Sequence, residues 1–233
     1  MKTASRLSLL KPSPIRAITD GTPPGAIPLG LGEPTWDLPE PARQALLRAP
    51  GPCGYVPHAG LTDLRKAVAA FHGATVDEVL ITTGSQGALF ALFQAWVEPG
   101  TKVLVPDPGF VAYPALARMA GAEPVPYALA PDRFRLDADA LLQVLAATPD
   151  ASAVILNLPS NPTGGGGDLE ALRRVAEACV ARGLLLISDE VYRDLHFGMR
   201  PPGLREVTDR GVCGELRQQG LGRTGTARGL GHR

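Results

Sequence analysis

The sequence predicts an α/β fold: a mainly parallel sheet with helices on both faces. From residue 79 onward, short apolar runs alternate with stretches of helical periodicity. The apolar runs are continuous rather than alternating with polar residues, which indicates strands buried on both faces. With 233 residues and 45% hydrophobic content, the chain can also bury a sizeable core.

The expected elements follow in order along the chain. Residues 1–30 are rich in Pro and Gly and are predicted to form an extended arm of the kind that reaches a neighbouring subunit. Helical spacing of apolar residues predicts short helices at 40–48 and 61–71. Strands are expected at 79–83, 102–106, 124–129, 153–158 and 184–188, alternating with helices at 85–97, 111–119, 137–147 and 168–181.

Composition excludes several classes of partner. Lys plus Arg equals Asp plus Glu at 23 each, so no basic surface favours nucleic acid. The apolar run at 7–10 is too short for a secretory leader or a membrane span. Cys53, Cys179 and Cys213 are few and lack metal-ligand spacing, which favours neither a disulfide framework nor a metal site. We therefore expect a cytoplasmic protein without metal, nucleic-acid or membrane partners.

In a parallel sheet the ligand lies beyond the carboxyl ends of the strands, so the residues that follow each strand deserve inspection. After the first strand, Ser85 and Gln86 open a helix whose free N–H groups suit a phosphate. Taken alone, this motif favours a simple Ser N-cap. After the second strand, Phe110 stands where a ring could stack on a flat heterocycle, although alone it fits a core residue better.

The last two strand ends carry the strongest signal. Asn157 and Asn161 bracket the end of the fourth strand, where they can simply cap a turn. Asp189 ends the fifth strand, with Tyr192 three residues later on the same side of a helical turn. A buried carboxylate needs a cation, and Arg193 points elsewhere by its spacing. A protonated ring nitrogen of a bound cofactor would serve.

In these motifs and their order, residues 29–197 resemble the amino-terminal half of a class I/II aminotransferase, a fold-type I enzyme that uses pyridoxal 5′-phosphate. The resemblance implies that Asp189 pairs with the ring nitrogen and that Tyr192 and Asn161 bind the ring's 3′ oxygen. It further implies a phosphate loop at Ser85 and Gln86, a stacking ring at Phe110, a bond from Tyr55 to the phosphate of the other subunit, and a substrate-carboxylate site at Gly32 and Asn161.

The activity that the resemblance implies is transfer of an amino group between an amino acid and a 2-oxo acid by a homodimer, with a lysine holding the cofactor as a Schiff base. The chain departs from the family here. Its lysines are Lys2, Lys11, Lys66 and Lys102, and none follows Tyr192, where an S-x-S-K pattern is expected. We therefore predict no catalytic lysine, no covalent attachment at the usual position, and no activity as translated.

The tail offers an explanation for this departure. Apolar periodicity ends at Cys213, after which Gly and Arg dominate. One choice of permitted codons for the tail, read one base later, gives AVNSVSKAWGAPGLRVGW, which contains the missing S-x-S-K block. Its lysine arises across Gln219 and Gly220. The hypothesis is a frameshifted, truncated aminotransferase.

This hypothesis divides the chain into three parts. They are an arm and small-domain segment at 1–45, an incomplete large cofactor-binding domain at 46–209, and an out-of-frame tail at 210–233. Such a sheet is expected to end at an open apolar edge and to be poorly soluble. Two alternatives stay open, a β-lyase that uses the same cofactor and a noncatalytic fragment. The glycine run at 164–167 is interpreted as a turn.

Overall fold

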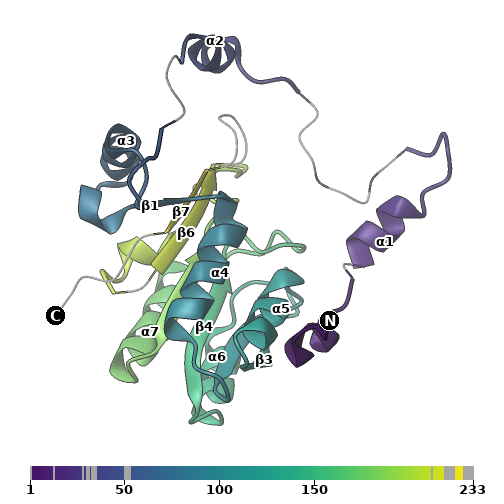
Figure 1. Ribbon diagram of the computed structural model, residues 1–233. Helices are drawn as coiled ribbons and strands as arrows, with labels where there is room; N and C mark the ends of the chain where they lie inside the picture. Colours follow the sequence, from purple (N-terminus) through teal and green to yellow (C-terminus); the bar gives the residue numbers. More distant parts are fainter. Residues whose placement is uncertain are drawn as a thin grey trace.

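A twisted sheet crosses the centre of the molecule in the computed structural model, which describes residues 2–12, 14–27, 29, 32, 36–49, 54–210, 212–217 and 224–227 (Figure 1). The strand order is β1-β7-β6-β5-β4-β2-β3. The strands are β1 (Leu80–Thr82), β2 (Lys102–Asp107), β3 (Glu123–Ala128), β4 (Ala151–Asn157), β5 (Leu185–Asp189), β6 (Val212–Arg217) and β7 (Thr224–Ala227).

Helices precede, separate and cover the strands. The α-helices are α1 (Pro14–Asp20), α2 (Glu40–Arg48), α3 (Thr62–His72), α4 (Gly84–Trp96), α5 (Ala112–Met119), α6 (Ala138–Ala146) and α7 (Leu169–Ala181). The short 3-10 helices are η1 (Ser5–Leu9), η2 (Val76–Glu78) and η3 (Leu204–Glu206). The predicted strands and helices between 40 and 189 are therefore confirmed, with boundaries that differ by a residue or two.

The direction of the strands decides where the loops meet. β2, β3, β4, β5 and β6 pair in parallel, whereas β7 pairs antiparallel with both β6 and β1. Because β1 is antiparallel to a strand that is itself antiparallel to β6, β1 runs in the same direction as β5. The loops that follow β1, β2, β4 and β5 therefore leave the sheet at one edge.

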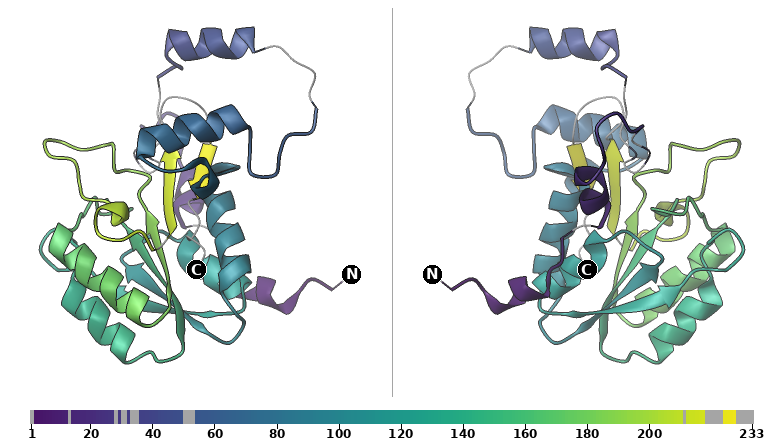
Figure 2. Two further views of the ribbon diagram at one scale, coloured as in Figure 1. Left: turned by 90° about the vertical axis from the view of Figure 1, so that its left-hand side faces the viewer. Right: turned by 90° about the vertical axis from the view of Figure 1, so that its right-hand side faces the viewer.

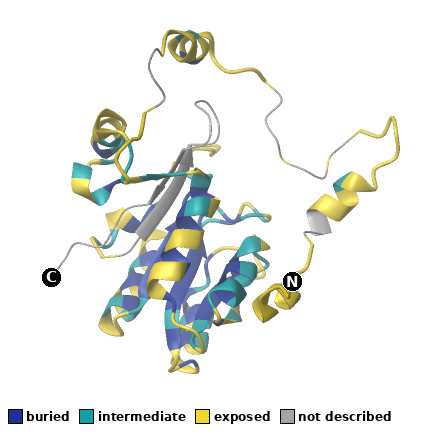
Figure 3. Cartoon of the chain, viewed as in Figure 1, coloured by how far each residue is buried: buried dark blue, intermediate teal, exposed yellow. Residues whose placement is uncertain are grey.

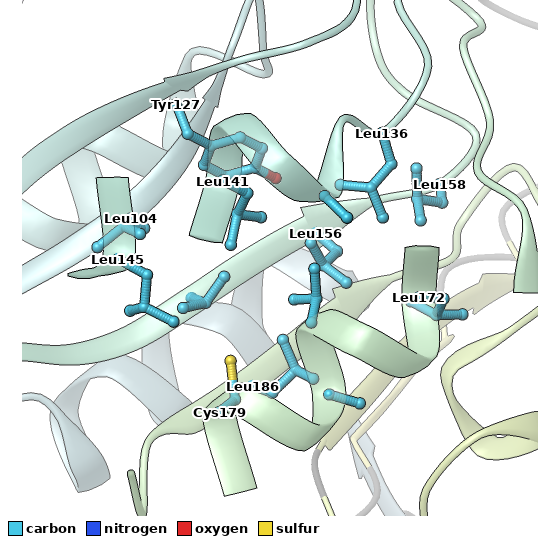
Figure 4. Close-up of a cluster of buried hydrophobic side chains, with 14 of the residues drawn as sticks. Leu104, Tyr127, Leu136, Leu141, Leu145, Leu156, Leu158, Leu172, Cys179 and Leu186 are labelled. Atoms are coloured by element: carbon cyan, nitrogen blue, oxygen red, sulfur yellow. The ribbon is translucent and has the colours of Figure 1, made fainter. Parts of the chain in front are cut away.

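Alternate residues of the central strands pack against different helical layers. Val103, Ala153 and Ile187 belong to a buried cluster with α4 and α5. Leu104 and Leu156, on the opposite face, belong to a second cluster with α6 and α7 (Figure 4). Both faces of β2, β4 and β5 are thus buried in apolar contacts, which explains why their sequences are continuous apolar runs.

Asp side chains and a glycine set the ends of the two helices on the second face. Asp137 caps α6 by accepting a hydrogen bond from the N–H of Ala140 at 3.0 Å. Asp168 caps α7 in the same way through Ala171 at 2.8 Å. Gly183, with φ of 64°, lets the chain turn from α7 into β5. Both helices therefore begin one residue later than the sequence pattern predicts.

The amino-terminal part departs from the predicted extended arm. It contains η1 and α1, and η1 contacts α5 of the same chain. Pro14 favours this departure because a proline at the first helical position fixes φ near the helical value. α1 and α2 stand away from the sheet and are largely exposed (Figures 2 and 3). No helix in the described ranges combines the length and apolarity needed to span a bilayer.

The tail extends the sheet beyond β5, and β1 and β3 are the edge strands. Ile187, Ser188 and Asp189 of β5 pair with residues 212–214 of β6, and β7 joins β6 to β1. The α4 helix contacts both tail strands. The physical reason is that sheet pairing uses backbone N–H and C=O groups, which every non-proline residue supplies, so a strand forms here without apolar periodicity. The out-of-frame origin of the tail stays a prediction.

The glycine run at 164–167 forms a close turn against a neighbouring loop. Gly164 has φ of 71°, in the region that favours glycine. A Cβ on Gly165 would lie 1.9 Å from the carbonyl oxygen of Phe134, whereas one on Gly166 would meet nothing within 4 Å. The turn interpretation of the run is therefore confirmed, and packing explains the glycine at 165.

Because Gly165 is crowded and Gly166 is not, alanine substitutions at the two positions form a matched pair of variants. Gly165→Ala is expected to lower the free energy of unfolding by about 2 kcal/mol or more, because a backbone carbonyl must move to admit the methyl group. Gly166→Ala should change it by less than about 0.5 kcal/mol. Urea denaturation followed by circular dichroism measures both values. Equal losses in the two variants would contradict the packing seen here.

Candidate functional site

The candidate site lies where β4 and β5 end side by side. Asn157 and Asp189 are partners in the parallel ladder, and both side chains are buried. The Asn157 amide donates to the backbone oxygen of Asp189 at 2.9 Å and accepts from the N–H of Asn161 at 2.7 Å. Asn157 thus ties the end of β5 to the loop that carries Asn161.

The Asp189 carboxylate is buried without a cation. Only 4% of the residue is exposed. Its Oδ2 accepts a hydrogen bond from Tyr113 Oη at 2.8 Å, and its Oδ1 accepts one from the Val191 N–H at 3.3 Å. Among the described residues, no Lys, Arg or His forms an ion pair with it. Burial therefore raises the pKa of Asp189, and the two hydrogen bonds offset this only in part.

The arginine nearest in sequence serves a different acid. Arg193 pairs with Glu190 at 3.4 Å and also with Glu206. The prediction that Arg193 does not neutralise Asp189 is therefore confirmed.

Tyr192 and Asn161 meet beside Asp189. Both are half-buried, and the Asn161 side chain forms a hydrogen bond with the Tyr192 hydroxyl. Burial is the largest cause that raises the pKa of Tyr192, followed by the nearby charge of Asp189, while the bond from Asn161 lowers it. The structure thus brings together the three residues Asn161, Asp189 and Tyr192 that the sequence singled out.

Phe110 joins this group through a residue that the sequence analysis did not select. The Phe110 ring makes an edge-to-face contact with Tyr113, with centroids 5.5 Å apart and an interplanar angle of 83°. Tyr113 is almost fully buried and donates to Asp189. The missed signal is spacing: Tyr113 follows Phe110 by three residues, at the start of a helix that leaves the same sheet edge.

The amino end of α4 lies at the same sheet edge. Thr83 occupies the N-cap position but makes no side-chain capping bond, and Thr82 Oγ1 instead donates to the Gly84 carbonyl at 2.9 Å. Ser85 lies buried in the first turn and Gln86 is exposed. The Ser N-cap interpretation of this motif is therefore wrong. A helix start without a side-chain cap, with a hydroxyl beside it, suits an anion.

Two predicted site residues lie outside this group. A Cβ on Gly32 would meet no atom within 4 Å, and Tyr55 is fully exposed. The structure does not bring either residue to the Asn157–Asp189 pair. Their implied roles, Tyr55 toward another subunit and Gly32 toward a substrate carboxylate, stay predictions.

The lysines also lie away from the candidate site. Lys102 begins β2, at the opposite end of the strand from the site, and pairs with Asp150 at 3.2 Å. Lys66 lies on α3 and pairs with Asp63 at 3.7 Å. Lys2 and Lys11 are exposed in the amino-terminal part. None of these amines is placed to hold a ligand beside Asp189.

A helix start suited to an anion and a buried acid with no cationic partner among the described residues lie at one edge of a parallel sheet, where α/β proteins bind their ligands. The sequence profile of aminotransferase class I and II matches residues 24–214. The chain belongs to this family, whose members depend on pyridoxal phosphate.

Named relatives agree with this assignment. Aspartate aminotransferase of Geobacillus stearothermophilus is 35% identical, over 94% of this chain and 58% of its own length. A probable N-succinyldiaminopimelate aminotransferase of Mycobacterium tuberculosis is 41% identical, over 74% of this chain and 46% of its own length. The chain therefore spans about half the length of the curated relatives it matches.

Solved structures show the same fold. The structure of N-succinyldiaminopimelate aminotransferase from Mycobacterium tuberculosis superposes with a TM-score of 0.88 at 34% identity, covering 98% of this chain and 64% of that one. The structure of Thermus thermophilus aspartate aminotransferase with maleate superposes with a TM-score of 0.87 at 31% identity. The match covers 99% of this chain and 65% of that one. The fold-type I architecture predicted from the sequence is thus confirmed.

The raised pKa of Asp189 predicts that the effect of replacing this residue on stability depends on pH. In the unfolded chain this carboxyl ionises at its ordinary pKa, but in the folded chain it holds its proton to a higher pH. The residue therefore destabilises the free protein increasingly as the pH rises from the unfolded pKa to the folded one. Asp189→Asn keeps an acceptor for Tyr113 and removes the charge.

We expect Asp189→Asn to stabilise the ligand-free chain by an amount that grows with pH above about 4. Urea denaturation of both proteins at a series of pH values measures this difference. If the difference in the free energy of unfolding does not change with pH, or if the wild type is the more stable protein at neutral pH, the buried carboxylate does not destabilise the free protein.

Proposed function

We propose that this chain is built as a pyridoxal-phosphate-dependent aminotransferase, which moves an amino group between an amino acid and a 2-oxo acid. The observation that carries the proposal is the buried Asp189 carboxylate, which has hydrogen-bond donors but no cationic partner among the described residues. A protonated pyridine nitrogen supplies the missing positive charge. No metal ion or nucleic acid is needed to explain the site.

The other residues at this sheet edge fit the remaining groups of the cofactor. The start of α4, with Ser85 and Gln86, would hold the phosphate. Tyr192 and Asn161, already joined by a hydrogen bond, would bind the ring's 3′ oxygen, and Phe110 would stack on the ring. When bound, pyridoxal 5′-phosphate supplies an electron sink for breaking a bond at the Cα of an amino acid.

The substrate is proposed only as a class. The relatives named above include an aspartate aminotransferase and a probable N-succinyldiaminopimelate aminotransferase, so amino acids that carry a further carboxylate are the first donors to test. Gly32 and Asn161 are proposed to lie near the substrate carboxylate, as the family resemblance implies.

We further propose that the chain as translated is inactive because its tail is out of frame. Two observations support this: no lysine follows Tyr192, and the family match ends at Gly214, one residue after the periodicity is lost. The position of β6 beside β5 is compatible with the proposal, since the restored frame would place its lysine shortly beyond that strand.

Binding of pyridoxamine 5′-phosphate tests the cofactor site, because this form needs no lysine. We expect the wild type to bind it measurably in fluorescence titrations, and Asp189→Asn to weaken binding about tenfold or more, since a charge-assisted hydrogen bond is lost. Asp194→Asn, which removes an exposed carboxylate paired with Arg200, is the matched control and should bind like the wild type. Equal binding by all three proteins would reject the site.

A second experiment tests the proposed frameshift. After incubation with pyridoxal 5′-phosphate and reduction with borohydride, peptide mass spectrometry should find no specific attachment in this chain, with Lys66→Arg and Lys102→Arg as controls for surface reaction. A gene with the frame restored near codon 213 should give one attached lysine and transaminase activity. Genomic DNA without a downstream family segment in any frame would refute the frameshift.

The exposed apolar surface of the amino-terminal part supports a homodimer. Ten of the described apolar side chains up to residue 61 are more than half exposed, an unusual amount for a monomer: Leu9, Ile18, Ile27, Leu29, Trp36, Leu46, Leu47, Tyr55, Val56 and Leu61. We propose that a second chain covers them, in keeping with an arm that reaches a neighbouring subunit.

Light scattering coupled to size-exclusion chromatography measures the oligomeric state. We expect the mass of two chains, and Leu46→Glu together with Leu47→Glu should give a monomer that stays folded, because both residues are exposed within one chain. A wild-type monomer would contradict the dimer. Aggregation of the wild type would instead favour the noncatalytic fragment.

A further inference from the structure

Two consecutive acids stand at the end of β5, where Asp189 is the last residue of the strand and Glu190 follows it, and they have different partners. Asp189 is held by Tyr113 and the Val191 N–H. Glu190 is equally buried, at 3% exposed, but its Oε1 accepts hydrogen bonds from Ser188 Oγ at 2.9 Å and from the Leu204 N–H at 2.7 Å. The family resemblance assigns Asp189 a role but leaves Glu190 without one.

The Glu190 carboxylate belongs to a buried ionic network. Its Oε2 lies 3.4 Å from Arg193, which also donates to the Pro201 carbonyl at 3.0 Å and pairs with Glu206. Gly203 packs so closely that a Cβ there would lie 2.7 Å from Glu190 Oε2. Glu190 therefore fixes the end of β5 to the segment at 201–206, and an apolar residue in its place would leave the Leu204 N–H and the Ser188 hydroxyl without this acceptor.

The same residue fixes the turn that carries Tyr192. The Arg193 N–H donates to the Glu190 carbonyl at 2.9 Å, which closes the turn around Tyr192. The Glu190 side chain thus bonds Ser188, which precedes Asp189, and the Glu190 carbonyl bonds Arg193, which follows Tyr192. Between these two bonds lie the acid and the phenol that the proposed function places against the cofactor ring.

We propose that Glu190 is a positioning residue, which holds Asp189 and Tyr192 in the geometry that binds the ring. This inference rests on the proposed function for its purpose, but its geometry can be tested without the cofactor. The Leu158 N–H donates to the Asp189 carbonyl at 3.2 Å and the Val191 N–H donates to its carboxylate, so exchange of these two amides reports the placement of Asp189.

The experiment compares Glu190→Gln with Glu206→Gln by hydrogen exchange and NMR. Each variant removes one carboxylate partner of Arg193, but only Glu190 contacts the end of β5. We expect exchange at Leu158 and Val191 to rise about tenfold in Glu190→Gln and less than about twofold in Glu206→Gln. The exchange rates of the β2 amides should not change in either variant. Affinity for pyridoxamine 5′-phosphate should fall about tenfold in Glu190→Gln alone.

The outcomes separate the inference from the proposed function. Unchanged exchange in Glu190→Gln, equal changes in both variants, or a rise that extends across β2 would overturn the positioning role. The expected exchange pattern without any binding, wild type included, would support the positioning role and reject the cofactor site. If Glu190→Gln does not fold, Ser188→Ala removes one bond to Glu190, and an absent rise at Leu158 and Val191 would overturn the proposal.

Discussion

The buried carboxylate of Asp189 is the constraint on which the candidate site depends. A charge at the end of an apolar strand is costly, and among the described residues a phenol and one backbone N–H, but no cation, stabilise it. The pKa of Asp189 is raised as a result. A buried acid with a raised pKa at the edge of a sheet is a feature typical of functional sites.

Two neighbouring elements keep this acid in place. Asn157, paired with Asp189 in the sheet, bonds its carbonyl and orients the loop of Asn161. The chain after β5 is closed by the Glu190 network. Because the parallel strands bring these loops to one edge, acid, amide and phenol meet without any long insertion in the chain.

Much of this arrangement could be predicted from residues alone, and the failures have physical causes. Continuous apolar runs identified β2, β4 and β5 because both faces of those strands are covered. Tyr113 was missed because its bond to Asp189 joins residues 76 apart in sequence. The strand β7 was missed because backbone pairing leaves no periodic pattern. The roles of Tyr55 and Gly32 stay predictions, because neither residue meets the Asn157–Asp189 pair within this chain.

The central claim is that Asp189 holds a protonated ring nitrogen. The most direct measurement is the 15N chemical shift of ring-labelled pyridoxamine 5′-phosphate bound to the wild-type chain. We expect a shift typical of a protonated nitrogen up to a pH well above the pKa of the free ring, and a shift typical of an unprotonated nitrogen in Asp189→Asn. An unprotonated nitrogen in the wild-type complex would show that Asp189 does not hold the ring in this way.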